Sequence, residues 1–245
     1  PHRPVEINLA PVWGDEPGPR KLAIVFGSPP ELHGQVGYTS ETRELKPRYS
    51  YSWDWCPRLV PAGARGSLAL RPATSGHAKL AGLRTELDAD LNQGRLIVRV
   101  ELEAPGQIHV QVAGEEWTSA GNAGYNDIIM NVPAPTPWWP NGQGEQALHE
   151  ATVTVRSEDG AISARWTRMV GFKHIEWRAC EAAPEGARPW ICVVNGRPVF
   201  LQGVNWTPAQ LAYMDATREE IGHLVGLYRE MGCNLLRVWG GAVLE

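Results

Sequence analysis

Apolar and polar residues alternate with a period of two through the middle of the chain. In the first such stretch, charged residues separate Leu83, Thr85 and Leu87. Successive side chains of a strand point to opposite faces of a sheet, so this spacing predicts strands with one buried face. The stretches with this alternation are 83–91, 96–102, 108–112, 151–155, 162–166 and 170–177. Since Gly, Pro or Asn turns separate them, they predict a β-sandwich of about 100 residues.

The first 75 residues show a weaker pattern. They are rich in Pro and Gly, which favours turns and loops. Short apolar stretches lie among these residues at 22–26, 49–51 and 67–70. We expect these three stretches to form strands that irregular loops connect.

A hairpin is predicted near residue 195. The apolar runs 190–194 and 197–201 flank the dipeptide Asn195-Gly196. Both central residues of a type I′ turn need a positive φ, which Asn and Gly tolerate well. The segment therefore predicts two antiparallel strands joined by a two-residue turn.

The last forty residues predict a helix followed by a strand. Thr217 and Glu220 have the spacing of a capping box, in which a hydroxyl and a carboxylate each bind a free backbone N–H. Apolar residues follow at helical spacing, and Gly232 is placed to end the helix. The apolar run 235–239 then predicts a buried parallel strand. This order is the opening of an α/β unit, and one such unit cannot bury both faces of its strand.

Composition and charge exclude several classes of protein. The chain is 43% hydrophobic and 20% charged, and its net charge of -4 comes without long charged runs. Disordered, collagen-like and coiled-coil chains are excluded, and neither nucleic acid nor a membrane is expected as a partner. The seven His have no ligand spacing, so we expect no metal site and no cofactor. Tryptophan is unusually frequent, with 11 Trp against 3 Phe.

The tryptophans form three clusters. Residues 51–58 place Asp54 between Trp53 and Trp55, which suits either core aromatics beside a turn or an aromatic and carboxylate lip that binds sugar. Rings stack on the apolar face of a pyranose, and a carboxylate accepts hydrogen bonds from adjacent hydroxyls. Residues 137–142 have Pro at both ends of a Trp pair, and we expect this segment to pack between sheets.

The third cluster lies at the ends of the two strands in the predicted α/β unit. In a (β/α)₈ barrel the carboxyl ends of the strands face the active site. This placement predicts that Asn205, Trp206, Arg237 and Trp239 face such a site, although ordinary packing at a barrel end would use the same positions. A buried Arg also needs a partner carboxylate.

These clusters, in this order, resemble the β-mannosidase branch of glycoside hydrolase family 2. Residues 51–58 are similar to the family's Gly-Trp-Asp-Trp-Gly-Pro-Arg signature, and residues 138–146 match its Trp-Trp-Pro-Asn-Gly-x-Gly-x-Gln segment. Residues 203–209 and 234–241 resemble the entry to the family's barrel. The Trp in the Arg-Val-Trp-Gly-Gly segment, Trp239, points to β-mannosidase within the family.

The resemblance implies a mainly β chain with three parts. Residues 1–77 would be the C-terminal part of a jelly-roll sugar-binding domain, 78–178 an immunoglobulin-like β-sandwich, and 179–245 the start of a catalytic (β/α)₈ barrel. It also implies that Asp54 binds sugar and that Trp239 lines the site of the terminal sugar. The sequence departs from the family where Ser52 and Cys56 replace Gly. Ala64-Arg65-Gly66 likewise stands in place of a Gly-Ile-Trp-Arg-Pro type run.

The resemblance implies an enzyme whose catalytic residues lie elsewhere. Family members are retaining hydrolases with two catalytic Glu, whose carboxyl groups must be about 5 Å apart. The resemblance places both Glu beyond residue 245, so we expect the chain to be an internal fragment that is inactive alone. It also places the true N-terminus before residue 1, so no compartment is predicted. No apolar run in the sequence approaches the roughly 20 residues that span a bilayer, and we therefore expect a soluble chain.

The expected function is that of a segment of a retaining exo-β-mannosidase, with β-mannosides as the carbohydrate partner. One alternative is another family 2 glycosidase, such as an exo-β-glucosaminidase or a β-galactosidase. A second alternative is a non-catalytic carbohydrate-binding β-sandwich module. A free-standing module would not carry the α/β unit at 190–241, which therefore favours the enzyme.

Overall fold

The computed structural model describes residues 5–14, 18–29, 47–64, 68–70 and 77–241. Its contacts divide the chain into two compact units. One unit contains residues 1–71 and 203–245, and the other contains residues 72–202. The described residues form a mainly β structure, as the sequence predicted.

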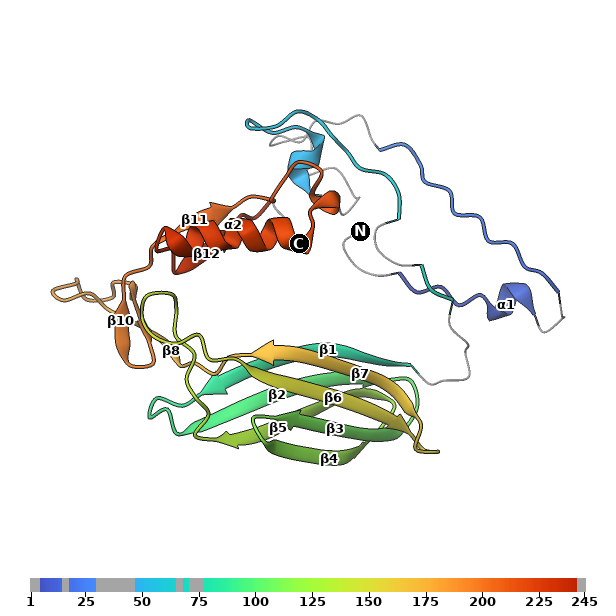
Figure 1. Ribbon diagram of the computed structural model, residues 1–245, viewed down its shortest axis with the longest axis horizontal. Helices are drawn as coiled ribbons and strands as arrows, with labels where there is room; N and C mark the ends of the chain where they lie inside the picture. The colour runs from blue at the N-terminus through green and yellow to red at the C-terminus, as the bar shows by residue number, and fades with distance from the viewer. Residues whose placement is uncertain (1–4, 15–17, 30–46, 65–67, 71–76, 242–245) are drawn as a thin grey trace. The chain divides into compact units, whose positions relative to one another are not determined.

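The larger unit is built around a sandwich of seven antiparallel strands (Figure 1). One sheet has the order β1-β2-β5 and the other has the order β4-β3-β6-β7. The strands are Ala78–Leu87 (β1), Gln93–Leu102 (β2), Gly106–Val112 (β3), Glu115–Gly121 (β4), Gly124–Pro133 (β5), His149–Ser157 (β6) and Ile162–Val170 (β7). The β-sandwich predicted from the alternating pattern is confirmed.

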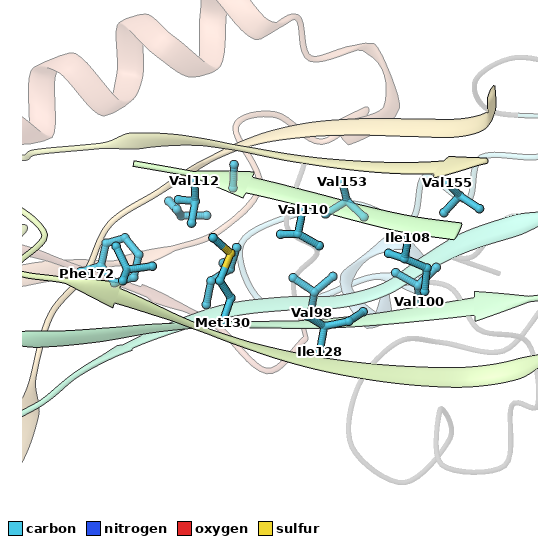
Figure 2. Packing of buried hydrophobic residues seen from close by; sticks show 14 of the residues in the cluster. Val98, Val100, Ile108, Val110, Val112, Ile128, Met130, Val153, Val155 and Phe172 are labelled. Carbon is cyan, nitrogen blue, oxygen red and sulfur yellow. The ribbon is translucent and has the colours of Figure 1, made fainter. Parts of the chain in front are cut away.

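The core of the sandwich lies between the two sheets. Figure 2 shows Val98 and Met130 of one sheet pointing toward Val110 and Val153 of the other. The inward side chains of β2 are buried while their neighbours along the strand are more exposed, which is the period of two seen in the sequence. Phe172 follows β7 and is fully buried in the same cluster. The alternation therefore reflects one buried face on each strand.

Three details of the predicted strands are wrong. Strands β4 and β5 were not predicted, although the inward residues of β5 alternate with outward ones. Strand β1 ends at Leu87 rather than at 91, because Asp88 begins a turn and its carboxylate accepts hydrogen bonds from the N–H groups of Asn92 and Gln93. The predicted strand at 170–177 is divided: β7 ends at Val170, and the next strand belongs to a different sheet.

That different sheet has three short antiparallel strands in the order β10-β9-β8. They are Ile175–Arg178 (β8), Ile191–Val194 (β9) and Arg197–Val199 (β10). Asn195 and Gly196 form the turn between β9 and β10, with φ values of 49° and 79°. Both are positive, as a type I′ turn requires, so the predicted hairpin is confirmed.

The smaller unit contains a parallel pair of strands joined by a helix. Gly203–Trp206 (β11) pairs with Leu235–Val238 (β12), and Arg218–Glu230 (α2) connects them. Thr217 caps the helix: its hydroxyl accepts from the N–H of Glu220, and the Glu220 carboxylate accepts from the N–H of Thr217. These hydrogen bonds from Thr217 also hold the pKa of Glu220 below its ordinary value. The predicted capping box, helix and parallel strand are confirmed.

The prediction that the parallel strand β12 is buried is wrong. The apolar side chains of β12 are exposed, and no residue of α2 is buried. In the part of the chain that the structure describes, β12 has β11 as its strand neighbour, and two strands with one helix cannot cover both faces. None of the helices formed by the described residues has the length and apolar character needed to cross a bilayer.

The strands predicted in the first 75 residues are also wrong where the structure describes them. Residues 22–26 are exposed and irregular, and residues 49–51 lie in the 3₁₀ helix Arg48–Tyr51 (η2). Residues 68–70 are exposed and irregular, while Ser67 lies outside the described residues. A strand needs a partner for its backbone groups, and no described strand pairs with these stretches. The other described helix before the sandwich is Ala10–Trp13 (α1). The division into three domains at 77 and 178 stays a prediction.

Candidate functional site

The Trp-Asp-Trp segment forms a tight turn in the smaller unit. The backbone N–H of Trp53 donates to the carbonyl of Cys56 at 3.2 Å, and the N–H of Cys56 donates to the carbonyl of Trp53 at 3.3 Å. Asp54 and Trp55 are therefore the two residues at the tip of the turn, and both are exposed. The turn presents a carboxylate and an indole ring next to each other.

The base of this turn is packed against other parts of the same unit. Cys56 is buried, and its Sγ donates to the carbonyl of Tyr49 at 3.3 Å. Burial raises the pKa of the Cys56 thiol above its ordinary value. The Trp53 ring meets the Trp239 ring edge-on, with 5.2 Å between the ring centroids. The base is thus fixed on both sides of the exposed tip.

Two tyrosines that the sequence analysis did not select support the tip from behind. The Trp55 ring lies 5.2 Å from the ring of Tyr49, at an angle of 34° between the planes. Tyr49 in turn meets Tyr213 edge-on at 6.1 Å, and both tyrosines are buried. Tyr49 lies in η2, and Tyr213 lies in the 3₁₀ helix Tyr213–Asp215 (η3). The aromatic cluster thus joins segments near both ends of the chain.

The paired strands β11 and β12 bring Asn205 and Arg237 together. These residues are partners in the parallel register, and the Arg237 Nη1 donates to the Asn205 Oδ1 at 2.9 Å. The partner of the Arg in this structure is therefore an amide oxygen rather than the carboxylate that burial would require. Both residues are exposed, so the guanidinium stays hydrated and does not need an opposite charge.

The close approach of the two strands depends on a glycine. A Cβ added to Gly203 would collide with the backbone carbonyl oxygen of Leu235, so no side chain fits there. Trp206, at the end of β11, is 5% exposed and its ring packs on Tyr228 of α2. The N–H of Trp239 donates to the carbonyl of Trp206, which continues the pairing beyond β12.

The structure brings together most of the predicted site residues. Trp53 and Trp239 belong to one aromatic cluster, the Trp55 ring contacts Tyr49 of that cluster, and Asp54 lies between the two tryptophans of the turn. Asn205 and Arg237 form a pair on β11 and β12. Trp206 lies instead in the packing between strand and helix. Among the described residues, no group of three His, Cys, Asp or Glu side chains is placed to hold a metal ion.

The second tryptophan pair lies in the larger unit, away from this turn in sequence. The Lys173 Nζ lies 4.9 Å from the centre of the Trp138 ring, and the Arg197 guanidinium lies 4.5 Å from that of Trp139. A Cβ on Gly171 would meet Trp138 at 2.9 Å. These contacts give the pair a packing role at the junction of the sandwich and the β8-β9-β10 sheet.

Ser52, the residue before the turn, has a strained backbone conformation. Its φ is 109° and its ψ is 138°, a conformation that L-residues rarely adopt and that glycine adopts freely. Ser52 is one of the two positions where glycine of the family signature is replaced. The structure thus explains why a glycine suits this position.

Replacing Ser52 with glycine is expected to stabilise the turn by about 1 kcal/mol, because relief of backbone strain outweighs the added freedom of the unfolded chain. Hydrogen exchange at the N–H groups of Trp53 and Cys56, which pair across the turn, measures this effect. Ser52→Ala is the matched control and should give no added protection, since alanine keeps the Cβ. Equal exchange rates in Ser52→Gly and the unchanged chain would contradict the prediction.

Comparison with known proteins identifies relatives over most of the chain. Residues 77–173 match the family model described as "Glycosyl hydrolases family 2". "Beta-mannosidase B" of Emericella nidulans is 26% identical over 230 residues, which cover 87% of this chain and 26% of that protein. "Probable beta-mannosidase" of Caenorhabditis elegans is 26% identical over 251 residues, which cover 90% of this chain and 27% of that protein. The chain thus spans about a quarter of the length of these relatives.

Solved structures show the same fold. The β-D-mannosidase of Dictyoglomus thermophilum matches 89% of this chain and 28% of its own chain, with a TM-score of 0.65 and 24% identity. The exo-chitosanase CsxA of Amycolatopsis orientalis matches 75% of this chain and 21% of its own, with a TM-score of 0.52 and 22% identity. Over most of its length, this chain therefore resembles the β-mannosidase-type enzymes of glycosyl hydrolase family 2.

Proposed function

We propose that this chain supplies sugar-binding residues to a retaining exo-β-mannosidase that hydrolyses terminal non-reducing β-D-mannose residues. One observation carries the proposal: Trp53 meets Trp239 and Trp55 meets Tyr49 of the same aromatic cluster, with the exposed Asp54 between the two tryptophans. These residues lie in two segments that resemble the β-mannosidase signatures. The relatives named as β-mannosidases support the choice of substrate.

Each residue of the site has a role that its chemistry permits. The exposed Asp54 carboxylate can accept hydrogen bonds from two adjacent sugar hydroxyls. The ring of Trp239 forms a wall for the apolar face of the terminal sugar, and Trp53 holds that ring in place. Arg237 has further N–H groups beyond the one that binds Asn205, and these can donate to a sugar hydroxyl.

The catalytic step requires groups that we assign to other parts of the enzyme. A retaining glycosidase needs an acid that protonates the leaving oxygen and a carboxylate that attacks the anomeric carbon, about 5 Å apart. We assign neither role to a residue of this chain. Its residues bind and orient the sugar, and the jelly-roll, sandwich and barrel divisions at 77 and 178 belong to this proposal.

The isolated 245-residue chain is expected to bind methyl β-D-mannopyranoside and to leave a chromogenic β-mannoside unhydrolysed, because it supplies sugar contacts without the catalytic pair. Titration of the sugar by NMR measures binding, and release of the chromophore measures hydrolysis. Trp239→Ala should weaken binding, whereas Trp190→Ala, which removes an exposed Trp outside the site, should leave it unchanged. Turnover above background would overturn the assignment of catalysis elsewhere, and absence of binding would overturn the sugar-binding role.

A further inference from the structure

The two tryptophans of the turn have different surroundings. Trp53 lies at the base of the turn, is partly buried, and meets Trp239 edge-on. Trp55 lies at the tip and is 43% exposed. Its ring packs on Tyr49. Two residues two positions apart therefore pack on different rings of one cluster.

The ring of Trp55 is supported by a buried ring although it is exposed. Tyr49, behind it, is buried, and Tyr213 packs on Tyr49 from another segment of the same unit. A large ring that is supported on one face and open on the other loses little conformational freedom when a ligand stacks on it. This arrangement suits a platform for a flat apolar surface, such as the face of a pyranose.

The two ring pairs lie on either side of one exposed carboxylate. Trp53 and Trp55 are two positions apart, so the two ring pairs lie at neighbouring positions of one short turn. Asp54 lies between them with its carboxylate exposed. A sugar on the Trp53 and Trp239 side and a second sugar on the Trp55 side would both lie within reach of this turn.

We propose that Trp55 binds the sugar unit next to the terminal one, the leaving-group sugar, and thereby selects oligosaccharides over simple β-mannosides. This inference rests on the proposed function, since it takes the Trp239 side as the place of the terminal mannose. Trp53 is a positioning residue that acts through Trp239. Tyr49 and Tyr213 position the ring of Trp55.

The test compares two probes on the chain and its Trp55→Ala variant. The probes are methyl β-D-mannopyranoside, which has one sugar, and β-1,4-mannobiose, which has two. Trp55→Ala should weaken mannobiose binding about tenfold, as is common when a Trp at the centre of a contact is truncated. It should change binding of the methyl glycoside by less than about twofold, because surface contacts outside a ligand's reach contribute little.

Saturation-transfer NMR identifies which sugar unit loses its contact. In the unchanged chain both units of mannobiose should receive saturation, and in Trp55→Ala the reducing-end unit should lose it. Trp55→Phe keeps a ring, so the reducing-end unit should still receive most of its saturation in this variant. Trp190→Ala should behave as the unchanged chain. Amide spectra of each variant show whether the turn is still folded.

The outcomes separate this inference from the proposed function. Equal weakening of both probes by Trp55→Ala would place Trp55 at the terminal sugar and overturn the inference alone. Mannobiose binding that is unchanged in Trp55→Ala would also overturn it. If the unchanged chain binds neither probe, the proposed function and the inference both fail.

Discussion

Replacing Phe172 with alanine is expected to lower the free energy of unfolding of the larger unit by about 3–5 kcal/mol. Phe172 is fully buried in the sandwich core, and its ring is so close to β2 that a Cβ on Gly94 would lie 2.8 Å from its Cδ1. The His149 ring also packs on it edge-on at 5.5 Å. Truncation removes the buried ring surface and leaves a cavity that the surrounding strands cannot close.

Denaturant unfolding of the 245-residue chain measures this loss, with amide exchange in β2 and β6 as the probe of the larger unit. Phe200 provides a matched control, since it is the same residue type in the same unit but is 84% exposed. Phe200→Ala should change stability by no more than about 0.5 kcal/mol. Similar losses in the two variants would show that Phe172 is not a core residue.

The sandwich could be predicted from the sequence because burial on one face imposes a period of two. The inward residues of β2 and β3 follow this period without interruption. Strand β5 was missed because Ile129 is an apolar residue on its exposed face, which hides the alternation of Ile128 and Met130 with polar neighbours. In β4 a small inward residue, Gly121, leaves no apolar signal at the end of the strand.

Local chemistry was the most reliable guide to the elements after residue 180. The turn at Asn195-Gly196 and the cap at Thr217 each depend on neighbouring residues, so a single sequence contains the information that they need. The strand predicted at 22–26 was wrong because a strand depends on residues distant in the sequence. A strand forms only with a partner, and a short apolar run does not show whether a partner exists.

In the candidate site, too, some residues could be predicted from the sequence and others could not. Spacing and resemblance selected Trp53, Asp54 and Trp239. Tyr49 and Tyr213 could not be found in this way, because they lie in 3₁₀ turns with no periodic pattern. The contact between Arg237 and Asn205 depends on the register of two parallel strands, which pattern reasoning does not supply.

The side chain of Asn195 ties the β9–β10 hairpin to the sandwich. Its Oδ1 accepts from the N–H of His174 at 2.8 Å, and its Nδ2 donates to the carbonyl of Trp138 at 3.0 Å. Its own N–H donates to the carbonyl of His174, and the residue is 6% exposed. The same His174 contacts β1, because its Nδ1 lies 3.0 Å from the carbonyl of Leu87. Asn195 thus has two functions, a positive φ for the turn and a pair of partly buried side-chain hydrogen bonds.

Replacing Asn195 with glycine separates these two functions. Glycine keeps the positive φ of the turn, so the whole effect comes from the lost side-chain hydrogen bonds. The N–H of His174 and the carbonyl of Trp138 lose their partners in a partly buried environment, at about 1–3 kcal/mol each. We expect Asn195→Gly to destabilise the larger unit by about 2–5 kcal/mol, since both groups are affected. Amide exchange at His174 and in β9 measures this loss.

Two further variants test the physical reason. Asn195→Asp keeps the acceptor for His174 but faces the carbonyl of Trp138 with an oxygen, so it should destabilise the unit despite its similar shape. Asn131→Gly is the control at an exposed strand position and should lose no more than about 1 kcal/mol, the usual effect of glycine in a strand. If Asn195→Gly loses no more than this control, the hairpin is held by its strand pairing alone.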